Sequence, residues 1–354
     1  MVNMSITSKN ISVVLQGSIK SEFVTKSIDS IIKFLPEAEI IISTWPCQNI
    51  PEEYIKKVSK IIINTDPGGV VFTQDGKIQN HNRQILSTKT GIKATSRKYV
   101  LKLRSDMLLT GTKFLDFFNK FPETDQDYKI FKSKILINNL YTRDLNSNKP
   151  FLFHPSDWVS FGYREDMLKL WDIPLTQEPE FSRWFVFHPT ISPDRNVLTR
   201  YHAEQYIWIS AIKKAGYAID FENWFSYTPQ LAEISERFLI NNFVVLNYQK
   251  HFTIVSQKYP NINGDSPTLT FNGWLDLYCK YLNVNPVIPF TWSRSRALGI
   301  HKDIIRLRKH FYRLKAPFSH IFKWCPEPVV CLLIFIRIIC ISIFNLLKYI
   351  FSKG

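Results

Sequence analysis

Asp106 is the carboxylate with the clearest chemical context in this sequence. It follows an apolar run, residues 99–103, and precedes Met107. A carboxylate in that position can hold a divalent cation, Mn²⁺ or Mg²⁺, against a diphosphate. An aspartate at a strand end can equally cap a helix or bond to a loop, so both interpretations stay open. Arg104 lies two residues earlier, and a guanidinium among buried residues needs an anionic partner.

A second group with phosphate-binding chemistry is Arg83. It stands between Asn82 and Gln84, where a helix is predicted to begin. An arginine beside a helix N-terminus combines a fork of donors with a favourable dipole, and both suit a phosphate. The alternative is a solvated first turn of the helix.

Glu204 is the candidate general base. It opens a predicted helix, residues 203–215, and is preceded by His202. A carboxylate there can take a proton from an acceptor hydroxyl, as displacement with inversion at a sugar carbon requires. It can also be only a favourable charge at a helix N-terminus. Asp157, just before a predicted strand, and His202 are candidates for acceptor contacts. Asp157 can also be a donor contact, or merely a polar residue that precedes the strand.

The elements that must position these groups alternate between strand-like and helix-like runs. The strand signals are residues 11–15, 39–45, 60–64, 99–103 and 158–161. The helix signals are residues 22–35, 52–58, 82–95, 165–171 and 203–215. Residues 233–282 show a mixed pattern to which no chemistry is assigned.

Strands with continuous apolar runs, separated by helices, predict an α/β fold with a mostly parallel sheet covered on both faces. Such sheets bind their ligands beyond the carboxyl ends of the strands. Gln16, Thr44, Asp66 and Asp106 each stand at that end of a successive strand. We therefore expect these four polar side chains to meet at one crevice.

Bulk composition indicates a folded protein of enzyme size. The 354 residues are 45% apolar and 14% aromatic. Of the formal net charge of +15, +10 lies in residues 290–354, beside a long apolar run, which argues against a nucleic-acid partner. The five cysteines show no paired spacing, and the polar N-terminus lacks the apolar core of a signal peptide. Both features favour a protein of the reducing cytosol.

Seven segments in fixed order resemble the WavE family of lipopolysaccharide-synthesis proteins, which are regarded as glycosyltransferases of the GT-A type. The segments are ISVVLQGSI, AEIIISTW, INTDPGG, NHNRQILST, VLKLRSDM, SDWVSFG and HAEQYIW. They span roughly residues 10 to 215. Several separated motifs in one order are more specific than any of them alone.

The resemblance implies a GT-A-like catalytic domain with a nucleotide-sugar donor. The donor-binding positions would be Gln16, Gly17, Thr44, Asp66, Arg83 and Arg104. Asp106 would be the metal- or diphosphate-binding carboxylate, and Glu204 the general base. Where the GT-A pattern has Asp-x-Asp, this sequence has Arg104-Ser105-Asp106. That departure puts the divalent cation in doubt and lets Arg104 itself neutralise part of the leaving phosphate.

Two parts are expected: a catalytic domain, residues 1–289, and a helical membrane-associating tail, residues 290–354. Within the first, residues 10–110 would bind the nucleotide and residues 130–289 the acceptor. In the tail, residues 300–318 show the pattern of a basic amphipathic helix, which suits an anionic membrane surface or packing on the protein's own core. Residues 328–347 form an apolar run interrupted by Arg337, which favours a monotopic anchor over a single span.

These observations predict an enzyme that moves a sugar from a nucleotide-sugar donor to a lipopolysaccharide-core, capsular or other cell-surface glycan or glycolipid, with inversion at the sugar carbon. It would work at the cytoplasmic face of the bacterial inner membrane, held there by the tail. One alternative is a nucleotidyltransferase of related fold, although Gln16-Gly17-Ser18 offers a single glycine for a phosphate loop. The other is a basic membrane-binding protein without enzymatic activity.

Overall fold

The structure is a computed structural model, and it describes residues 6–147, 150–188, 196–260, 262 and 268–286. The tail predicted for residues 290–354 lies outside the described residues. Among those that the structure does describe, no helix combines the length and the apolar character needed to cross a bilayer.

A mixed seven-stranded sheet forms the centre of the described part of the chain, with strand order β10-β8-β9-β6-β1-β2-β3. The strands are β1 (Ile11–Gln16), β2 (Glu39–Thr44), β3 (Lys60–Ile63), β6 (Tyr99–Arg104), β8 (Ile135–Asn138), β9 (Val159–Tyr163) and β10 (Phe243–Leu246). Four of the pairings are parallel, as the apolar runs predicted. Strand β9 runs antiparallel to both of its neighbours, β6 and β8. The prediction of a mostly parallel α/β fold is thus confirmed.

Two small antiparallel ribbons accompany this sheet. One is the hairpin of β4 (Val70–Val71) and β5 (Ile78–Gln79). The other joins β7 (Met107–Leu109) to β11 (Ile254–Ser256), with Ile254 opposite Leu109. This second ribbon brings a segment from the far end of the described chain to the strand end that carries Asp106.

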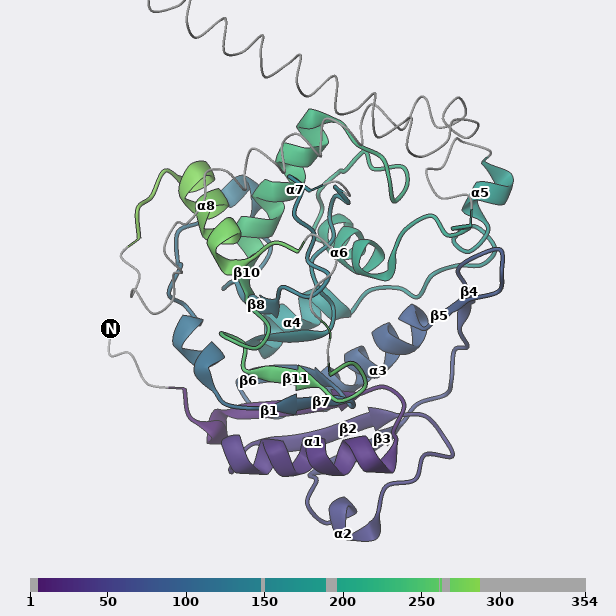
Figure 1. Ribbon diagram of the computed structural model, residues 1–354, viewed down its shortest axis with the longest axis vertical. Helices are drawn as coiled ribbons and strands as arrows, with labels where there is room; N and C mark the ends of the chain where they lie inside the picture. Colours follow the sequence, from purple (N-terminus) through teal and green to yellow (C-terminus); the bar gives the residue numbers. More distant parts are fainter. Residues whose placement is uncertain (1–5, 148–149, 189–195, 261, 263–267, 287–354) are drawn as a thin grey trace, which may run out of the picture. The chain divides into compact units, whose positions relative to one another are not determined.

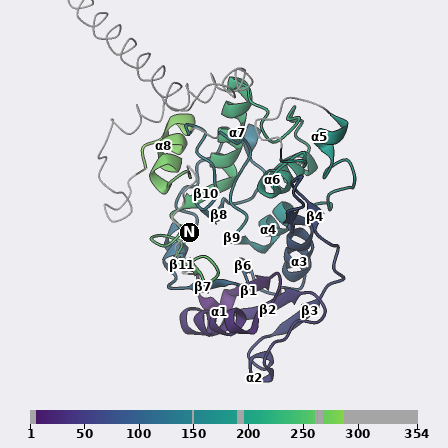
Figure 2. The same cartoon turned by 45° about the vertical axis from the view of Figure 1, so that its right-hand side comes forward.

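Helices cover the sheet on both faces (Figures 1 and 2). They are α1 (Ser21–Phe34), α2 (Glu52–Ile55), α3 (His81–Lys93), α4 (Arg164–Trp171), α5 (Trp184–Phe187), α6 (Ala203–Lys214), α7 (Pro229–Asn242) and α8 (Phe271–Leu282). Short 3₁₀ turns occupy Ser8–Asn10, Lys113–Phe117 and Gln126–Tyr128. Both views place α1 on one side of β1 and β2, and α3 on the other.

One predicted helix is shorter than its apolar spacing suggested. The helix expected at residues 52–58 ends at Ile55. The next residues form tight turns, with Lys57 N–H donating to the carbonyl of Tyr54, and Ser59 N–H then bonds to the carbonyl of Ile40 at the sheet. The chain must turn back to start β3, which leaves room for one helical turn only.

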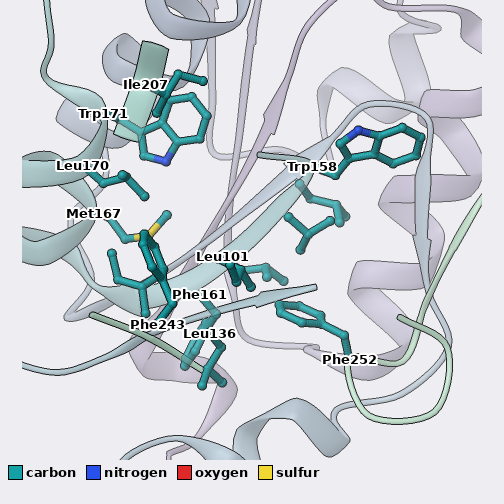
Figure 3. Close-up of a cluster of buried hydrophobic side chains, with 14 of the residues drawn as sticks. Leu101, Leu136, Trp158, Phe161, Met167, Leu170, Trp171, Ile207, Phe243 and Phe252 are labelled. Atoms are coloured by element: carbon teal, nitrogen blue, oxygen red, sulfur yellow. The ribbon is translucent and has the colours of Figure 1, made fainter. Parts of the chain in front are cut away.

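The core between the sheet and its helices is aromatic. Figure 3 shows Leu101, Leu136, Phe161 and Phe243 from four strands of the sheet packed with side chains of α4 and α6. The ring of Trp171 in α4 is 1% exposed, and Phe161 is fully buried. Burial of this apolar surface is the main force that holds β8, β9 and β10 against the helices.

Candidate functional site

A cleft of about 710 Å³ opens at the carboxyl ends of β1, β2 and β6. Its lining residues are Gln16, Gly17, Ser18, Lys20, Phe23, Trp45, Pro46, Gln48, Asp66, Asn80, Arg83, Gln84, Arg104, Ser105, Asp106 and Lys258. Of the four polar positions expected to meet there, three line the cleft: Gln16, Asp66 and Asp106. We call this hollow the donor cleft, after the donor-binding positions that the sequence resemblance implies.

Thr44, the fourth position, lies beneath the wall of the cleft rather than in it. Its side chain is fully buried, and its Oγ1 donates to the carbonyl of Gly17 at 2.7 Å. Gly17 has φ +109°, a backbone conformation that side-chain-bearing residues rarely adopt. Thr44 therefore fixes the turn at which the chain leaves β1, and Gly17 presents its backbone to the cleft.

Arg104 and Asp106 form a two-pronged ion pair at the end of β6. Arg104 Nε donates to Asp106 Oδ1 at 3.0 Å, and Nη2 donates to Oδ2 at 2.8 Å. The guanidinium also lies 4.3 Å from the ring centroid of Trp158, which holds its plane in place. The anionic partner expected for Arg104 is thus Asp106, and this carboxylate offsets the burial that opposes the charge, so that the pKa of Arg104 is raised.

An equivalent pair stands on the other wall of the donor cleft. Arg83, in the first turn of α3, donates from Nε and Nη2 to the two carboxylate oxygens of Asp66, both at 2.7 Å. Its Nη1 donates to Asn80 Oδ1 at 2.6 Å. The hydrogen bonds from this guanidinium are the main cause that lowers the pKa of Asp66. Each of the two carboxylates among the described lining residues is therefore engaged by one arginine.

Two lysines of the cleft were not singled out from the sequence. Lys20 immediately precedes α1, and Lys258 follows β11; both side chains are exposed and line the cleft. Gln257 anchors the second of them: its backbone N–H donates to the carbonyl of Asp106 at 2.9 Å, and its Nε2 donates to the carbonyl of Phe23 at 2.9 Å. Lys20 lies close to the Gln16-Gly17 motif and could have been found there, whereas Lys258 depends on long-range strand pairing.

The carboxylate oxygens of this cleft do not suit the divalent cation that the sequence left in doubt. Mg²⁺ and Mn²⁺ take oxygen ligands at about 2.0–2.2 Å in a nearly octahedral arrangement. Both oxygens of Asp106 already accept from Arg104, and both oxygens of Asp66 accept from Arg83. Within the described part of the chain, no three His, Cys, Asp or Glu side chains gather as a metal-binding group.

Lys102, two residues before Arg104 in β6, supports the wall behind the cleft. It is fully buried, and its ammonium donates to the carbonyl oxygens of Asp157 and Trp158. Burial lowers its pKa to about 7. Because these two carbonyls fix the start of β9, Lys102 sets the position of the Trp158 ring on which Arg104 rests.

Glu204 lies outside the lining of the donor cleft, in the first turn of α6. Its Oε2 is 3.5 Å from Nε2 of His154, and its side chain is 15% exposed. Burial raises the pKa of Glu204 and lowers that of His154 to about 3. His154 had no signal in the sequence, since it lies in the loop between β8 and β9.

Asp157 and His202, the predicted acceptor contacts, are not among the lining residues of the cleft. The carbonyl of Asp157 nevertheless accepts from Gln84 Nε2, which lines it, at 3.0 Å. Asp157 is 8% exposed, and burial and then the charge of Glu204 raise its pKa to about 6. The His202 ring is stacked on Phe151 at 5.2 Å and lies 5.7 Å from His154. Burial lowers the pKa of His202 well below the ordinary histidine value, so the ring is neutral.

Tyr141 and Trp158 lie between the two groups of residues. Their ring centroids are 5.4 Å apart, and Trp158 also carries the Arg104 guanidinium. The pKa of Tyr141 is raised, chiefly by burial and next by the charge of Glu204, while Arg104 acts on it in the opposite direction. Tyr141 therefore lies close enough to both Glu204 and Arg104 for their charges to act on its hydroxyl. The residues around Glu204 thus lie next to the cleft.

One protein family matches this chain: its model, described as WavE lipopolysaccharide synthesis, covers residues 11–306. No curated protein matches the sequence. Among solved structures, the chain is similar to the apo-form glycosyltransferase GlyE of Streptococcus pneumoniae TIGR4. The identity is 11% and the TM-score 0.33, with 88% of this chain and 64% of that chain covered. The chain thus spans less than two thirds of the length of GlyE.

Two further similar structures have bound ligands. One is the mannosyltransferase PcManGT of Pyrobaculum calidifontis in complex with GDP-Man and Mn²⁺, at 8% identity and TM-score 0.38, covering 94% of this chain and 80% of that one. The other is glucosyl-3-phosphoglycerate synthase of Mycobacterium tuberculosis with Mn²⁺, UDP and glucosyl-3-phosphoglycerate, at 14% and 0.30, covering 66% and 78%. These likenesses are distant, so the assignment rests on the family model, which matches most of the chain. The protein belongs to the WavE lipopolysaccharide synthesis family.

Proposed function

We propose that this protein is a glycosyltransferase that moves a sugar from a nucleoside-diphosphate donor to a hydroxyl of a lipopolysaccharide-core or other cell-surface glycan. Membership of the WavE family supports the enzyme class. The observation that carries the proposal is the donor cleft itself, where four cationic side chains surround two carboxylates at the carboxyl ends of a mostly parallel sheet. That surplus of positive charge suits a diphosphate.

On the donor side, we assign the Arg83–Asp66 pair to the nucleoside and the Arg104–Asp106 pair to the phosphates. Arg83, Asp66 and Asn80 present donors and acceptors that suit the edge of a nucleobase or a ribose. Arg104, Lys20 and Lys258 present positive charge that suits the two phosphates. The backbone of Gly17, which has no side chain to obstruct it, allows a close approach between the two regions.

On the acceptor side, we assign the general base to Glu204. Its raised pKa makes it a stronger base than an exposed glutamate, and its remaining exposure leaves it within reach of a hydroxyl. The acceptor oxygen attacks the anomeric carbon as the bond from that carbon to the phosphate oxygen breaks. The hydroxyl proton passes to Glu204, and the nucleoside diphosphate leaves with the bonding electrons. One displacement of this kind inverts the configuration of the sugar carbon.

The leaving nucleoside diphosphate gains negative charge as the bond breaks. Cationic groups already in place at that point stabilise the transition state more than the bound substrate. Arg104 is held by Trp158 and Asp106, so little reorganisation is needed when the charge develops. Asp157 and His202 remain our candidates for contacts with the acceptor, beside the base.

We further propose that the enzyme works at the cytoplasmic face of the bacterial inner membrane. The support is the sequence of residues 290–354, with its basic amphipathic pattern followed by an apolar run. Such a tail would hold the catalytic region where a lipid-linked acceptor is made.

The test of the proposed function is a transfer assay with the full chain. A panel of UDP- and GDP-sugars is incubated with truncated lipopolysaccharide, and both nucleoside diphosphate release and the mass of the acceptor are followed. We expect one donor to release its nucleoside diphosphate while the acceptor gains the mass of one sugar. Failure of every nucleotide and nucleotide sugar to bind the protein would refute the assignment of the donor cleft.

A further inference from the structure

The side chains of the donor cleft can balance the charge of a bound diphosphate without a metal ion. Its described lining has four cationic side chains, Lys20, Arg83, Arg104 and Lys258, and two carboxylates, Asp66 and Asp106. Each carboxylate is matched by one arginine through two hydrogen bonds. Lys20 and Lys258 remain, and neither has a carboxylate partner among the described residues. A nucleoside-diphosphate sugar carries one negative charge on each of its two phosphates, so two free ammonium groups complement it.

A divalent cation would have to displace a guanidinium before it could bind Asp106. The Asp106 side chain is 10% exposed, and Arg104 donates to both of its carboxylate oxygens. Arg104 has little freedom to swing away, because its guanidinium rests on Trp158 and its strand position is fixed next to β1. A metal at Asp106 would also lie beside a cation that has lost its partner, which is unfavourable in a partly buried site.

Asp106, whose carboxylate a metal ion would need, also helps to position Lys258. Gln257 N–H bonds to the carbonyl of Asp106, and Gln257 Nε2 bonds to Ser27 Oγ at 3.1 Å as well as to Phe23. These bonds fix the backbone beside Lys258 at the rim of the cleft. The chain that carries Lys258 is therefore held beside Asp106 by these contacts.

We infer that Lys20 and Lys258 balance the two charges of the donor diphosphate of this enzyme, that Arg104 beside them adds hydrogen bonds to it, and that binding and transfer need no divalent cation. This inference rests on the proposed function, since it assumes a nucleoside-diphosphate donor in the cleft. It assigns to Asp106 the role of holding Arg104 in position. The aspartate and the incoming diphosphate then compete for one guanidinium.

The test measures the affinity of the full chain for UDP and GDP by titration calorimetry, in EDTA and again with Mn²⁺. We expect one of the two nucleotides to bind in EDTA, with a Kd that Mn²⁺ leaves unchanged. Binding that requires Mn²⁺ would overturn the inference but leave the proposed donor site intact. If neither nucleotide binds under either condition, both the inference and the proposed donor site are wrong.

Single substitutions separate the lysines from general surface charge. Lys20→Gln and Lys258→Gln should each weaken nucleotide binding in EDTA by about tenfold, because each removes one charge-assisted contact with phosphate. Lys33→Gln is the matched control, since this exposed lysine lies at the far end of the helix that Lys20 precedes. Unaltered affinity in both cleft variants would contradict the inference.

The nucleotide affinity of Asp106→Asn distinguishes a metal-free site from a site in which Asp106 binds a metal ion. If Asp106 only holds Arg104, the amide weakens the pairing and the guanidinium becomes more available, so that nucleotide binding in EDTA is as tight as in the unmodified protein or tighter. If Asp106 were a metal ligand, the variant would lose the binding that Mn²⁺ supports. The second result would refute a metal-free site.

Discussion

Nε2 of His154 lies 3.5 Å from Oε2 of Glu204, while Nδ1 of the same ring is 2.9 Å from the carbonyl oxygen of Tyr141. A carbonyl can only accept, so the ring carries its proton on Nδ1 and turns the lone pair of Nε2 toward Glu204. A proton that Glu204 takes from an acceptor hydroxyl can then be shared with His154. The pair is thus arranged to hold a proton that arrives during transfer.

Glu204→Gln should therefore lower the turnover number by about a hundredfold or more, the usual contribution of general base catalysis. The affinity for the nucleoside diphosphate should not change, because Glu204 lies outside the donor cleft. Nucleoside diphosphate release measures the first quantity and calorimetry the second. Glu165→Gln, an exposed glutamate in the first turn of α4, is the control. Equal rates in the two variants would mean that another residue removes the proton.

The pH dependence of kcat/KM should show an acidic limb that belongs to Glu204. A base works only when it is deprotonated, so the rate falls as the pH drops through its pKa. Burial raises that pKa above the ordinary glutamate value of 4.5, and the limb should therefore lie above this pH. Asp157, with a pKa of about 6, is the other buried carboxyl nearby. A limb that disappears in Asp157→Asn while Glu204 is intact would assign it to Asp157 instead.

Local patterns were enough to predict the framework of the donor cleft. Strand β1 is a short apolar run that ends at Gln16, and α3 begins next to Arg83, so the sequence placed both residues correctly at element ends. The parallel arrangement followed from the apolar runs alone. It then required the carboxyl ends to meet, as Gln16, Asp66 and Asp106 do. The WavE resemblance, drawn from motifs in the same region, is confirmed by the family model.

Contacts between distant parts of the chain could not be predicted in this way. Strand β10 comes from residues whose pattern was mixed, and its pairing with β8 joins segments about a hundred residues apart. Lys258 reaches the cleft only because β11 pairs with β7. His154 meets Glu204 through a loop whose residue Tyr141 has φ +63°, a conformation that no sequence motif announces.

Gly91→Ala should destabilise the fold, although alanine is the better helix former. A Cβ at this position of α3 would lie 2.4 Å from Val14 Cγ1 and 3.2 Å from Ser43 Cβ, side chains of β1 and β2. Forcing the helix away from the sheet should cost about 1–3 kcal/mol. Urea unfolding measures the change, with the exposed Lys26→Ala on α1 as control. A rise in stability would show that the helix does not approach the sheet this closely.

Deletion of residues 290–354 should separate membrane binding from nucleotide binding. We expect the shortened protein to keep its affinity for the nucleoside diphosphate and to lose sedimentation with anionic phospholipid vesicles, because the tail carries +10 of the net charge. The full chain with vesicles of neutral phospholipid is the control for charge. Loss of nucleotide binding on deletion would favour the alternative of a basic tail-driven binder.

Buried histidines should make the protein less stable in mild acid. His251 is fully buried between the rings of Phe117 and Phe271, and burial lowers its pKa from 6.5 to about 4. Below pH 6.5 the unfolded chain therefore takes up a proton that the folded chain refuses. The free energy of unfolding falls with decreasing pH until about pH 4, by about 1.4 kcal/mol per pH unit for one such group. His81 acts in the same direction, with a pKa of about 4.

His251→Phe removes one of these groups and keeps an aromatic ring in the aromatic site. The slope of unfolding free energy against pH, measured by urea titration at several values between pH 4.5 and 6.5, should then be shallower by about one proton. Asp157, whose raised pKa adds stability as the pH falls, is unchanged in this variant and does not affect the difference. An unaltered slope would mean that His251 accepts a proton in the folded state, and hence that water reaches the ring between Phe117 and Phe271.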